Sequence, residues 1–320
     1  MSAPQPDAPS PGPPSSDGHV PGGGLPGLRR DRKPKPLSRA GRNLPAAISV
    51  GLALLIILLA GLFLWPLGFV LIAVSAALLG VWEVYRALET HGTRIPVVPV
   101  LAAAVAIPAT AYFGGQEAQL FALLASCAAV LLWQSLEHPA GAARGVFAGV
   151  FVVLWIPFLL GYAVLPLHAT TPPPGLGLWL SGAVPPATLE LALTLLLVVA
   201  NDTFGYIVGA SLGRHPMAPK ISPKKSWEGF AGSVGGAMAV GVLGAVLLLG
   251  RPWWEGLVLA VVMVGAATAG DLAESMVKRE LGIKDMSSIL PGHGGMMDRL
   301  DSILFATPAA FLVFSLLPSS

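Results

Sequence analysis

Long apolar runs dominate the sequence from about residue 44 onward. A membrane-spanning helix needs about 20 mainly apolar residues. Nine runs approach that length, at residues 44–64, 67–85, 95–113, 118–136, 145–167, 188–210, 229–250, 253–273 and 301–317. Only 11% of the residues are charged, whereas a soluble globular domain carries about 25%. The sequence therefore predicts an all-α, polytopic membrane helix bundle with about nine transmembrane helices.

The residues before the first run have a different composition. Residues 1–43 are rich in Pro, Gly and Ser and hold no apolar run, which is typical of a disordered tail. Its basic residues are Arg29, Arg30, Arg32, Lys33, Lys35, Arg39 and Arg42. We interpret them as a topogenic signal that also attracts anionic lipid headgroups. No nucleic-acid partner is expected, because no aromatic or folded reading element accompanies the charge. Residues 44–320 are predicted to form the membrane-embedded domain.

The positions of Lys and Arg predict the orientation. If the N-terminus is cytoplasmic and nine helices alternate, 18 of the 19 Lys and Arg residues lie on the cytoplasmic side, and only Arg251 lies outside. Cytoplasmic loops carry such an excess. The sequence thus predicts a multi-pass protein of the cell membrane, with its N-terminus and the polar segments 201–228 and 271–301 facing the cytoplasm. The single Cys127 excludes an intramolecular disulfide and a thiolate metal cage.

Two apolar runs contain acids that need a partner. Asp202 follows Asn201 inside one run, where a carboxylate is costly unless it is paired, metal-bound or facing water. We favour a polar cavity near the cytoplasmic face over a simple bond to a neighbouring helix. In the other run, Asp271, Glu274 and Lys278 recur on one helical face. This face could bind a metal and a phosphate, or it could form surface ion pairs at the helix end.

The segment SPKKSWEG, residues 222–229, combines two lysines with a helix start. Ser226 could cap the following helix, with Glu228 in its first turn. Such a helix N-terminus binds anions readily. We favour a phosphate clamp that uses Lys224 and Lys225, although a cap with interfacial lysines would also explain the pattern.

Residues 284–301 combine glycines with closely spaced acids. The Pro and Gly residues favour a tight loop, and Asp298 and Asp301 lie on one helical turn. Carboxylate oxygens suit Mg²⁺, which usually keeps waters and shares substrate phosphates. Arg299 and His293 could reach phosphate oxygens. Capping of the last helix is the alternative role for the two acids.

The charged order of this region resembles a known family signature. It reads Ser-x-Val-Lys-Arg, four residues, Lys-Asp, and later Leu-Pro-Gly-His-Gly-Gly-Met-x-Asp-Arg-Leu-Asp, and it runs from Ser275 to Asp301. This order resembles the signature of phosphatidate cytidylyltransferases, also called CDP-diacylglycerol synthases. The resemblance extends to Asn201-Asp202, to residues 222–229 and to the helix bundle. It implies a nucleotidyltransferase of phospholipid biosynthesis that converts CTP and phosphatidate to CDP-diacylglycerol and pyrophosphate.

The resemblance and the charges together suggest a role for each candidate residue. The expected catalytic residues are Asp271, Asp298, Asp301, Lys278 and Arg299. Metal binding is expected at Asp271 and Asp301, with Asp202 and Glu274 as helpers. Substrate binding is expected at Ser222, Lys224, Lys225, Ser226, Ser275, Arg279, Lys284 and His293. The expected cofactor is Mg²⁺, and the expected partners are CTP, phosphatidate, the lipid bilayer and a second copy of the chain, since Gly- and Ala-rich helices allow close contact.

Two other functions fit parts of the pattern. An ion-coupled transporter would also place acids in the membrane, but most of the charge lies at one face and no inverted repeat is evident. A CTP-dependent lipid kinase would release CDP instead of pyrophosphate.

Overall fold

The computed structural model describes residues 44–137, 142–169, 184–289 and 294–317, with side chains from residue 52 onward. All of them belong to one compact unit, Arg42–Ser320. The tail of residues 1–43 and His293 lie outside the described residues, so the expectations for them stay predictions.

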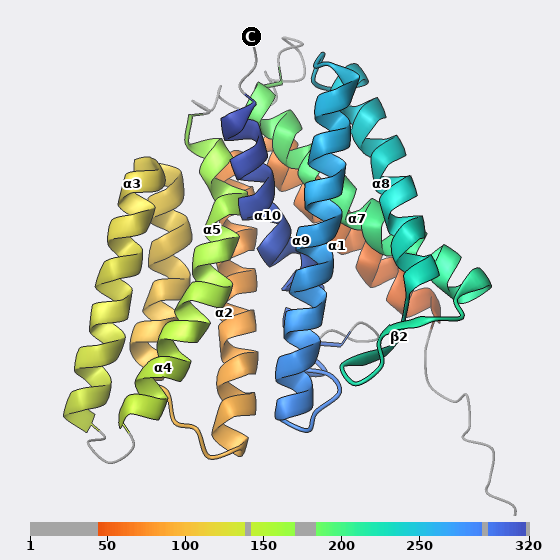
Figure 1. The fold of residues 1–320 in the computed structure, drawn as a ribbon. Coiled ribbons are helices and arrows are strands. Elements are labelled where there is room, and N and C mark those ends of the chain that lie inside the picture. Colours follow the sequence, from red (N-terminus) through yellow and green to blue (C-terminus); the bar gives the residue numbers. More distant parts are fainter. Residues whose placement is uncertain (1–43, 138–141, 170–183, 290–293, 318–320) are drawn as a thin grey trace, which may run out of the picture. The chain divides into compact units, whose positions relative to one another are not determined.

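Helices make up almost all of the described chain (Figure 1). The α-helices are α1 (Leu44–Leu64), α2 (Pro66–Thr90), α3 (Val97–Glu137), α4 (Ala142–Val153), α5 (Leu159–Val164), α7 (Pro186–Leu212), α8 (Trp227–Leu247), α9 (Trp253–Glu280) and α10 (Met297–Leu316). A π-helical turn, η1 (Leu154–Phe158), joins α4 to α5, and a 3₁₀ turn, η2 (Leu165–Ala169), follows α5. Strands β1 (Pro216–Ala218) and β2 (Ser222–Ser226) form a two-stranded antiparallel ribbon between α7 and α8.

The predicted number of nine spans is wrong. Within the described residues, seven helical segments are long and apolar enough to cross a membrane. The predicted runs 95–113 and 118–136 both fall in α3. In α1, the residues with described side chains form only a shorter apolar stretch, Leu52–Leu64. The protein is therefore an all-α, multi-span membrane bundle with fewer separate spanning helices than the sequence indicated.

A glycine explains how two predicted segments fall within α3. A straight helix of its 41 residues would be about 60 Å long, roughly twice the hydrocarbon thickness of a bilayer. At Gly115 the backbone leaves helical geometry, with φ 73° and ψ −164°. Positive φ is accessible to glycine without steric cost. The side chain of His168 packs against this position, so the break in α3 is held from the end of η2.

Buried side chains form two apolar clusters within the described residues. One is shared mainly by α2, α3 and the α4–α5 segment, and the other by α7, α8, α9 and α10. Small residues let the helices of the second cluster approach closely: a Cβ at Gly241 of α8 would lie 2.5 Å from the Gly256 carbonyl oxygen of α9. The glycine-rich face of α8 is therefore used inside the chain.

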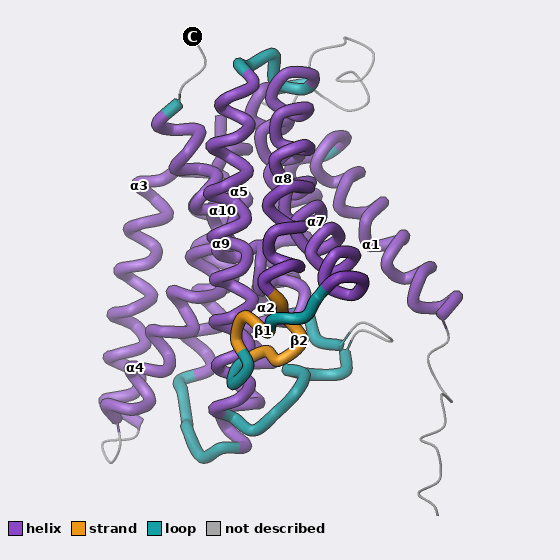
Figure 2. The backbone as a smooth tube through the Cα atoms, turned by 45° about the vertical axis from the view of Figure 1, so that its right-hand side comes forward, coloured by secondary structure: helices purple, strands orange, loops and turns teal. Residues whose placement is uncertain are grey.

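The two polar segments of the sequence meet at one end of the bundle. Figure 2 shows the ribbon beside the lower ends of the helices, and Figure 1 shows that the connection from α9 to α10 lies at the same end. The α8–α9 connection, which contains Arg251, lies at the opposite end. These two basic connections thus share one end of the bundle, and the orientation across the membrane stays a prediction.

Arg251 links three helices at that opposite end. Its Nη2 lies 2.6 Å from Glu190 Oε1 of α7, and its Nη1 lies 3.3 Å from Glu255 Oε2 of α9. Nη1 also donates to the Leu317 carbonyl oxygen, just after α10. The Arg251 side chain is only 10% exposed, so its loss would leave the half-buried Glu190 without its cation.

We expect Arg251→Ala to lower the free energy of unfolding by about 3 kcal/mol, because removing one partner leaves a buried charge uncompensated. Thermal unfolding in detergent, followed by tryptophan fluorescence, would measure the change. Arg86→Ala is the matched control: its pair with Glu89 is exposed and should contribute less than about 1 kcal/mol. Equal effects of the two changes would contradict this role of Arg251.

Candidate active site

A cavity of about 290 Å³ lies where α7, α8, α9 and the ribbon meet. Its lining includes Asp202, Lys224, Lys225, Ser226 and Asp271, all of which the sequence singled out. Asp202 therefore faces a polar cavity, as its position inside an apolar run indicated. The cavity brings together residues that are up to 70 positions apart in the chain.

Close packing of α7 on α8 forms one side of this cavity. A Cβ at Gly205 would lie 2.4 Å from Ser233 Oγ, so only glycine allows this approach. Ser233 Oγ donates to the Asn201 carbonyl oxygen at 2.6 Å, and Asn201 Nδ2 donates to Asp202 Oδ1 at 2.9 Å. Asn201 Oδ1 is buried without a hydrogen-bond partner among the described residues. The Asn201 amide, on the same helix, thus orients the Asp202 carboxylate. The Asn201 Oδ1 atom beside it remains an acceptor without a partner among the described residues.

The start of α8 confirms the predicted cap. Ser226 has extended backbone geometry, and its Oγ accepts a hydrogen bond from the Gly229 N–H at 3.1 Å. Glu228 accepts hydrogen bonds from the backbone N–H groups of Arg214 and His215 at 3.1 and 3.2 Å. Its Oε1 also lies 2.5 Å from His215 Nδ1. Glu228 therefore fastens the ribbon to the helix that follows it.

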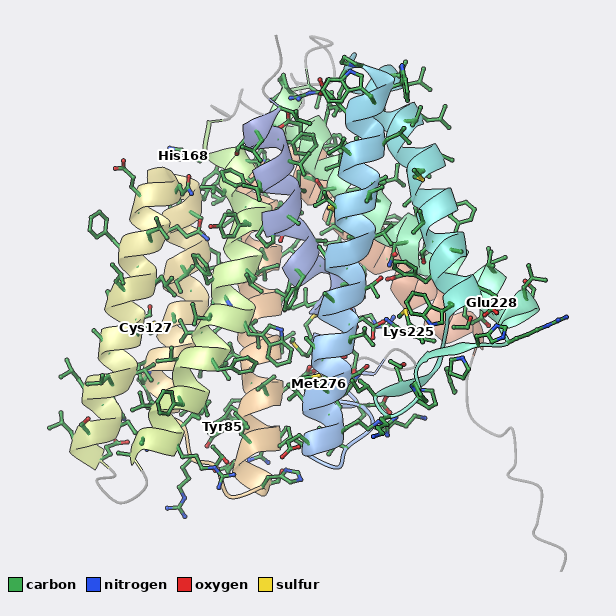
Figure 3. All side chains as sticks on the ribbon, viewed as in Figure 1. Tyr85, Cys127, His168, Lys225, Glu228 and Met276 are labelled. Carbon is green, nitrogen blue, oxygen red and sulfur yellow. The ribbon has the colours of Figure 1, made fainter. Side chains whose placement is uncertain are left out.

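The ribbon carries Lys225 to α9 (Figure 3). Lys225 Nζ lies 2.5 Å from Asp271 Oδ2, and both side chains are part-exposed. Lys224, the preceding residue, is exposed beside the same cavity. One lysine is therefore held by an aspartate, and the other is open to an incoming anion.

Aspartates from three helices lie in this part of the bundle. Asp202 of α7 and Asp271 of α9 line the cavity, and Asp301 of α10 lies beside Gly270 of α9, the residue before Asp271. The two helices α9 and α10 touch here, because a Cβ at Gly270 would lie 2.3 Å from the Asp301 carbonyl oxygen. Asp301 Oδ1 accepts its neighbour's N–H, from Ser302, at 2.6 Å. A cation would be favoured near carboxylates that lie at the same end of the bundle.

Lys278 has a different environment from the one that the sequence indicated. Its Nζ lies 2.6 Å from Glu274 Oε2 and 2.8 Å from Asp298 Oδ1. Glu274 is only 1% exposed, and its Oε1 lacks a hydrogen-bond partner among the described residues. Lys278 thus forms ion pairs with two carboxylates inside the protein.

Asp298 also holds the segment before α10. Its Oδ2 accepts the Gly295 N–H at 2.8 Å and the Met286 N–H at 3.3 Å. With Lys278 on Oδ1, both carboxylate oxygens have protein donors. This arrangement suits a residue that fixes a loop.

The remaining predicted residues surround these groups. Ser275 Oγ lies 3.4 Å from Asp271 Oδ1, and Arg279 Nε donates to the Ile221 carbonyl oxygen at 3.1 Å, which links the end of α9 to the ribbon. Ser222 is half-buried in β2, and Lys284 and Arg299 are exposed.

Sequence reasoning missed Glu83. This residue of α2 is 2% exposed and accepts hydrogen bonds from the Met296 and Met297 N–H groups, each at 2.8 Å. Ser287 Oγ donates to the same carboxylate at 2.5 Å. The signal was available, because Glu83 is a lone acid in an apolar run, and that argument had identified Asp202.

The donor chemistry of the three aspartates fits a hard divalent cation. Among the described residues, no three or more His, Cys, Asp or Glu side chains are already arranged around a single metal position. Mg²⁺ does not need such a cage, because it usually binds one or two carboxylates together with waters and substrate phosphates. Asp202, Asp271 and Asp301 could supply those carboxylates.

Comparison with known proteins identifies relatives over most of the chain. Residues 45–317 match the cytidylyltransferase family. A phosphatidate cytidylyltransferase of Mycobacterium bovis is 39% identical over 304 residues, which cover 88% of this chain and 91% of the relative. The protein of that name from Mycobacterium leprae is 36% identical over 312 residues, covering 92% and 95%. A third, from Haemophilus influenzae, is 38% identical over 158 residues, covering 48% and 51%.

The contact between α9 and α10 leads to a stability prediction. We expect Gly270→Ala to lower the free energy of unfolding by about 1–3 kcal/mol, because the added methyl meets the Asp301 carbonyl oxygen. Gly265→Ala on the same helix is the control: nothing lies within 4 Å of its Cβ, so stability should be unchanged or raised by up to about 1 kcal/mol. Thermal unfolding in detergent compares them, and a stable Gly270→Ala protein would exclude the close helix contact.

Proposed function

The chain belongs to the cytidylyltransferase family, and on that premise we infer that it is a phosphatidate cytidylyltransferase. It transfers CMP from CTP to phosphatidate and releases pyrophosphate, in the plane of a membrane that its helices span. The observation that carries this conclusion is the match to relatives of that name along about nine-tenths of the chain. The convergence of acids and lysines at one end of the bundle supplies the groups that the reaction needs.

The reaction joins two polyanions. A phosphate oxygen of phosphatidate attacks the α-phosphorus of CTP, a new P–O bond forms, and the bond from that phosphorus to the β-phosphate's bridging oxygen breaks. The attacking phosphate is already anionic, so the reaction requires no strong general base. The main barrier is charge repulsion, which fixed cationic groups lower by stabilising the charge that develops on the phosphates.

We assign Mg²⁺ binding to Asp271 and Asp301, with Asp202 as the third oxygen donor. When bound, Mg²⁺ would neutralise phosphate charge and orient the α-phosphate of CTP. The support is that Asp202 and Asp271 line one cavity and that α10 places Asp301 beside Gly270, the neighbour of Asp271. Glu274 is a poorer ligand than the sequence indicated, since it is buried against Lys278.

We assign phosphate binding to the exposed and part-exposed cations around the cavity. Lys224 is exposed at the cavity, and Lys225 lies beside Asp271, so a phosphate near that aspartate would meet its ammonium group. Ser222, Ser275, Arg279, Lys284, Arg299 and His293 complete the proposed substrate-binding set, as the family resemblance implies. Lys278, Glu274 and Asp298 hold the shape of the site.

We propose that the end of the bundle with the ribbon faces the cytoplasm, since the basic connections lie there and CTP is a cytoplasmic metabolite. A homodimer stays a prediction. Gly236 and Gly241 of α8 pack on α7 and α9 of the same chain, and the exposed Leu243 and Leu247 offer the remaining α8 surface to a second copy.

The reaction predicts a label transfer. Purified protein in detergent micelles with phosphatidate, Mg²⁺ and CTP labelled in the α-phosphate should move the label into the organic phase. Asp301→Asn should reduce this transfer at least about 10³-fold, because charge stabilisation in the transition state supplies several kcal/mol. Glu117→Gln, which changes an exposed carboxylate of α3, is the control and should leave the rate unchanged.

Two outcomes would overturn the assignment. Wild-type rates from Asp301→Asn would remove that residue from the site. Transfer of label from the γ-phosphate, with no transfer from the α-phosphate, would identify a lipid kinase instead.

Two ribbon lysines test the phosphate-binding proposal. We expect Lys224→Met to raise the KM for CTP about 10-fold or more, since one hydrogen bond to a charged group contributes about 1.5–3 kcal/mol. Lys220→Met removes an equally exposed charge that does not line the cavity, so its KM should change little. Steady-state kinetics at fixed ionic strength would separate a specific contact from general attraction, which predicts equal effects.

A further inference from the structure

Glu83 contacts the segment before α10 from a helix more than 200 residues earlier in the chain. Both of its carboxylate oxygens are used: Oε1 accepts from the Met296 N–H and from Ser287 Oγ, and Oε2 accepts from the Met297 N–H. It does not line the cavity that holds Asp202 and Asp271. Its contacts are therefore with the protein segment that leads to the catalytic carboxylates.

We propose that Glu83 is a positioning residue for cytidylyl transfer, because its buried carboxylate fixes the start of α10 and with it the place of Asp301. This inference rests on the proposed function of the site. Glu83 touches neither substrate in this assignment, and it acts through the backbone of α10.

The start of α10 needs such a partner. The first backbone N–H groups of any helix lack intrahelical acceptors, and Met296, at the N-cap position of α10, makes no side-chain cap in the described structure. Glu83 supplies the acceptor from α2, and its negative charge complements the positive end of the helix. The three donors in turn offset the cost of burying a carboxylate.

Gly295 shows how tightly this region is held. A Cβ at this glycine would lie 2.8 Å from Glu83 Oε2 and 3.0 Å from Asp298 Oδ2. Asp298 accepts the Gly295 N–H, while Glu83 accepts the next two N–H groups along the chain. Two carboxylates from different helices thus fix four consecutive residues, 295–298, and Asp301 follows within one turn.

The carboxylate geometry suggests a substitution that removes one acceptor and keeps the size of the side chain. Glu83→Gln keeps the size of the side chain, but one of its two head atoms becomes an NH₂ donor. Because both glutamate oxygens accept backbone N–H groups, one of these groups would then face a donor. Glu89→Gln is the matched control on the same helix, where the carboxylate is exposed and, within the described part of the chain, binds Tyr85 and Arg86.

Hydrogen exchange tests the contact without using activity. We expect amide exchange in a peptide containing residues 295–298 to become at least about 10-fold faster in Glu83→Gln and to stay unchanged in Glu89→Gln, because lost hydrogen bonds lower the local opening energy. Unchanged exchange in Glu83→Gln would overturn the proposal, whatever the enzyme's activity.

Kinetics then separates positioning from simple stability. We expect Glu83→Gln to lower kcat per folded molecule by about 10–100-fold, because a displacement of about 1 Å can cost that much. The KM for CTP should change less than about threefold, since the phosphate-binding lysines are untouched. A protein that melts earlier but retains wild-type kcat would show that Glu83 is only structural.

Ser287→Ala provides a second test if Glu83→Gln folds poorly. It removes one hydrogen bond to Glu83 and leaves both backbone bonds in place, so it should give a smaller change in the same direction in exchange and in kcat. Wild-type behaviour in both measurements would count against the proposal. If the wild-type protein transfers no CMP, the proposed function fails, while the exchange experiment still reports on the contact itself.

Discussion

An ionised side chain inside a membrane bundle is stable only with a partner, and this constraint organises the polar end of the protein. Lys225 pairs with Asp271, and Lys278 pairs with Glu274 and Asp298. Each pair joins segments that are distant in sequence or fixes a helix end. The pairing leaves a surplus of negative charge around Asp202 and Asp301, which a divalent cation could offset so that anionic nucleotide phosphates can approach.

The acids and bases of the site fall into two groups with different roles. Asp271 lines the cavity where chemistry is proposed, the ribbon brings Lys224 and Lys225 to it, and Asp301 is proposed to bind metal beside it. Asp298 and Lys278 belong to the supporting group because their polar atoms are already occupied by protein partners. Preorganised charge is effective in catalysis because it need not rearrange during the reaction, and the supporting group provides that rigidity.

Much of this arrangement could be predicted from the sequence, because charge is rare in it and therefore informative. The long apolar runs indicated the helical class. Single polar residues in or beside those runs indicated the cap at Ser226 and the cavity at Asp202. The helix count differs because the two runs predicted on either side of Gly115 belong to the single element α3, and because the described part of α1 holds only a short apolar stretch. The environment of Lys278 and the role of Glu83 depend on contacts between distant helices, which one-dimensional spacing does not encode.

The link at Arg251 has a mechanical consequence. It ties together α7, α9 and the end of α10, the helices that carry Asp202, Asp271 and Asp301 toward the other end. At the other end, α9 and α10 are held together as well, by the contact of Gly270 with the Asp301 backbone and by the pair of Lys278 with Asp298. A change in bilayer thickness should therefore tilt these helices together and leave the spacing of their carboxylates unchanged.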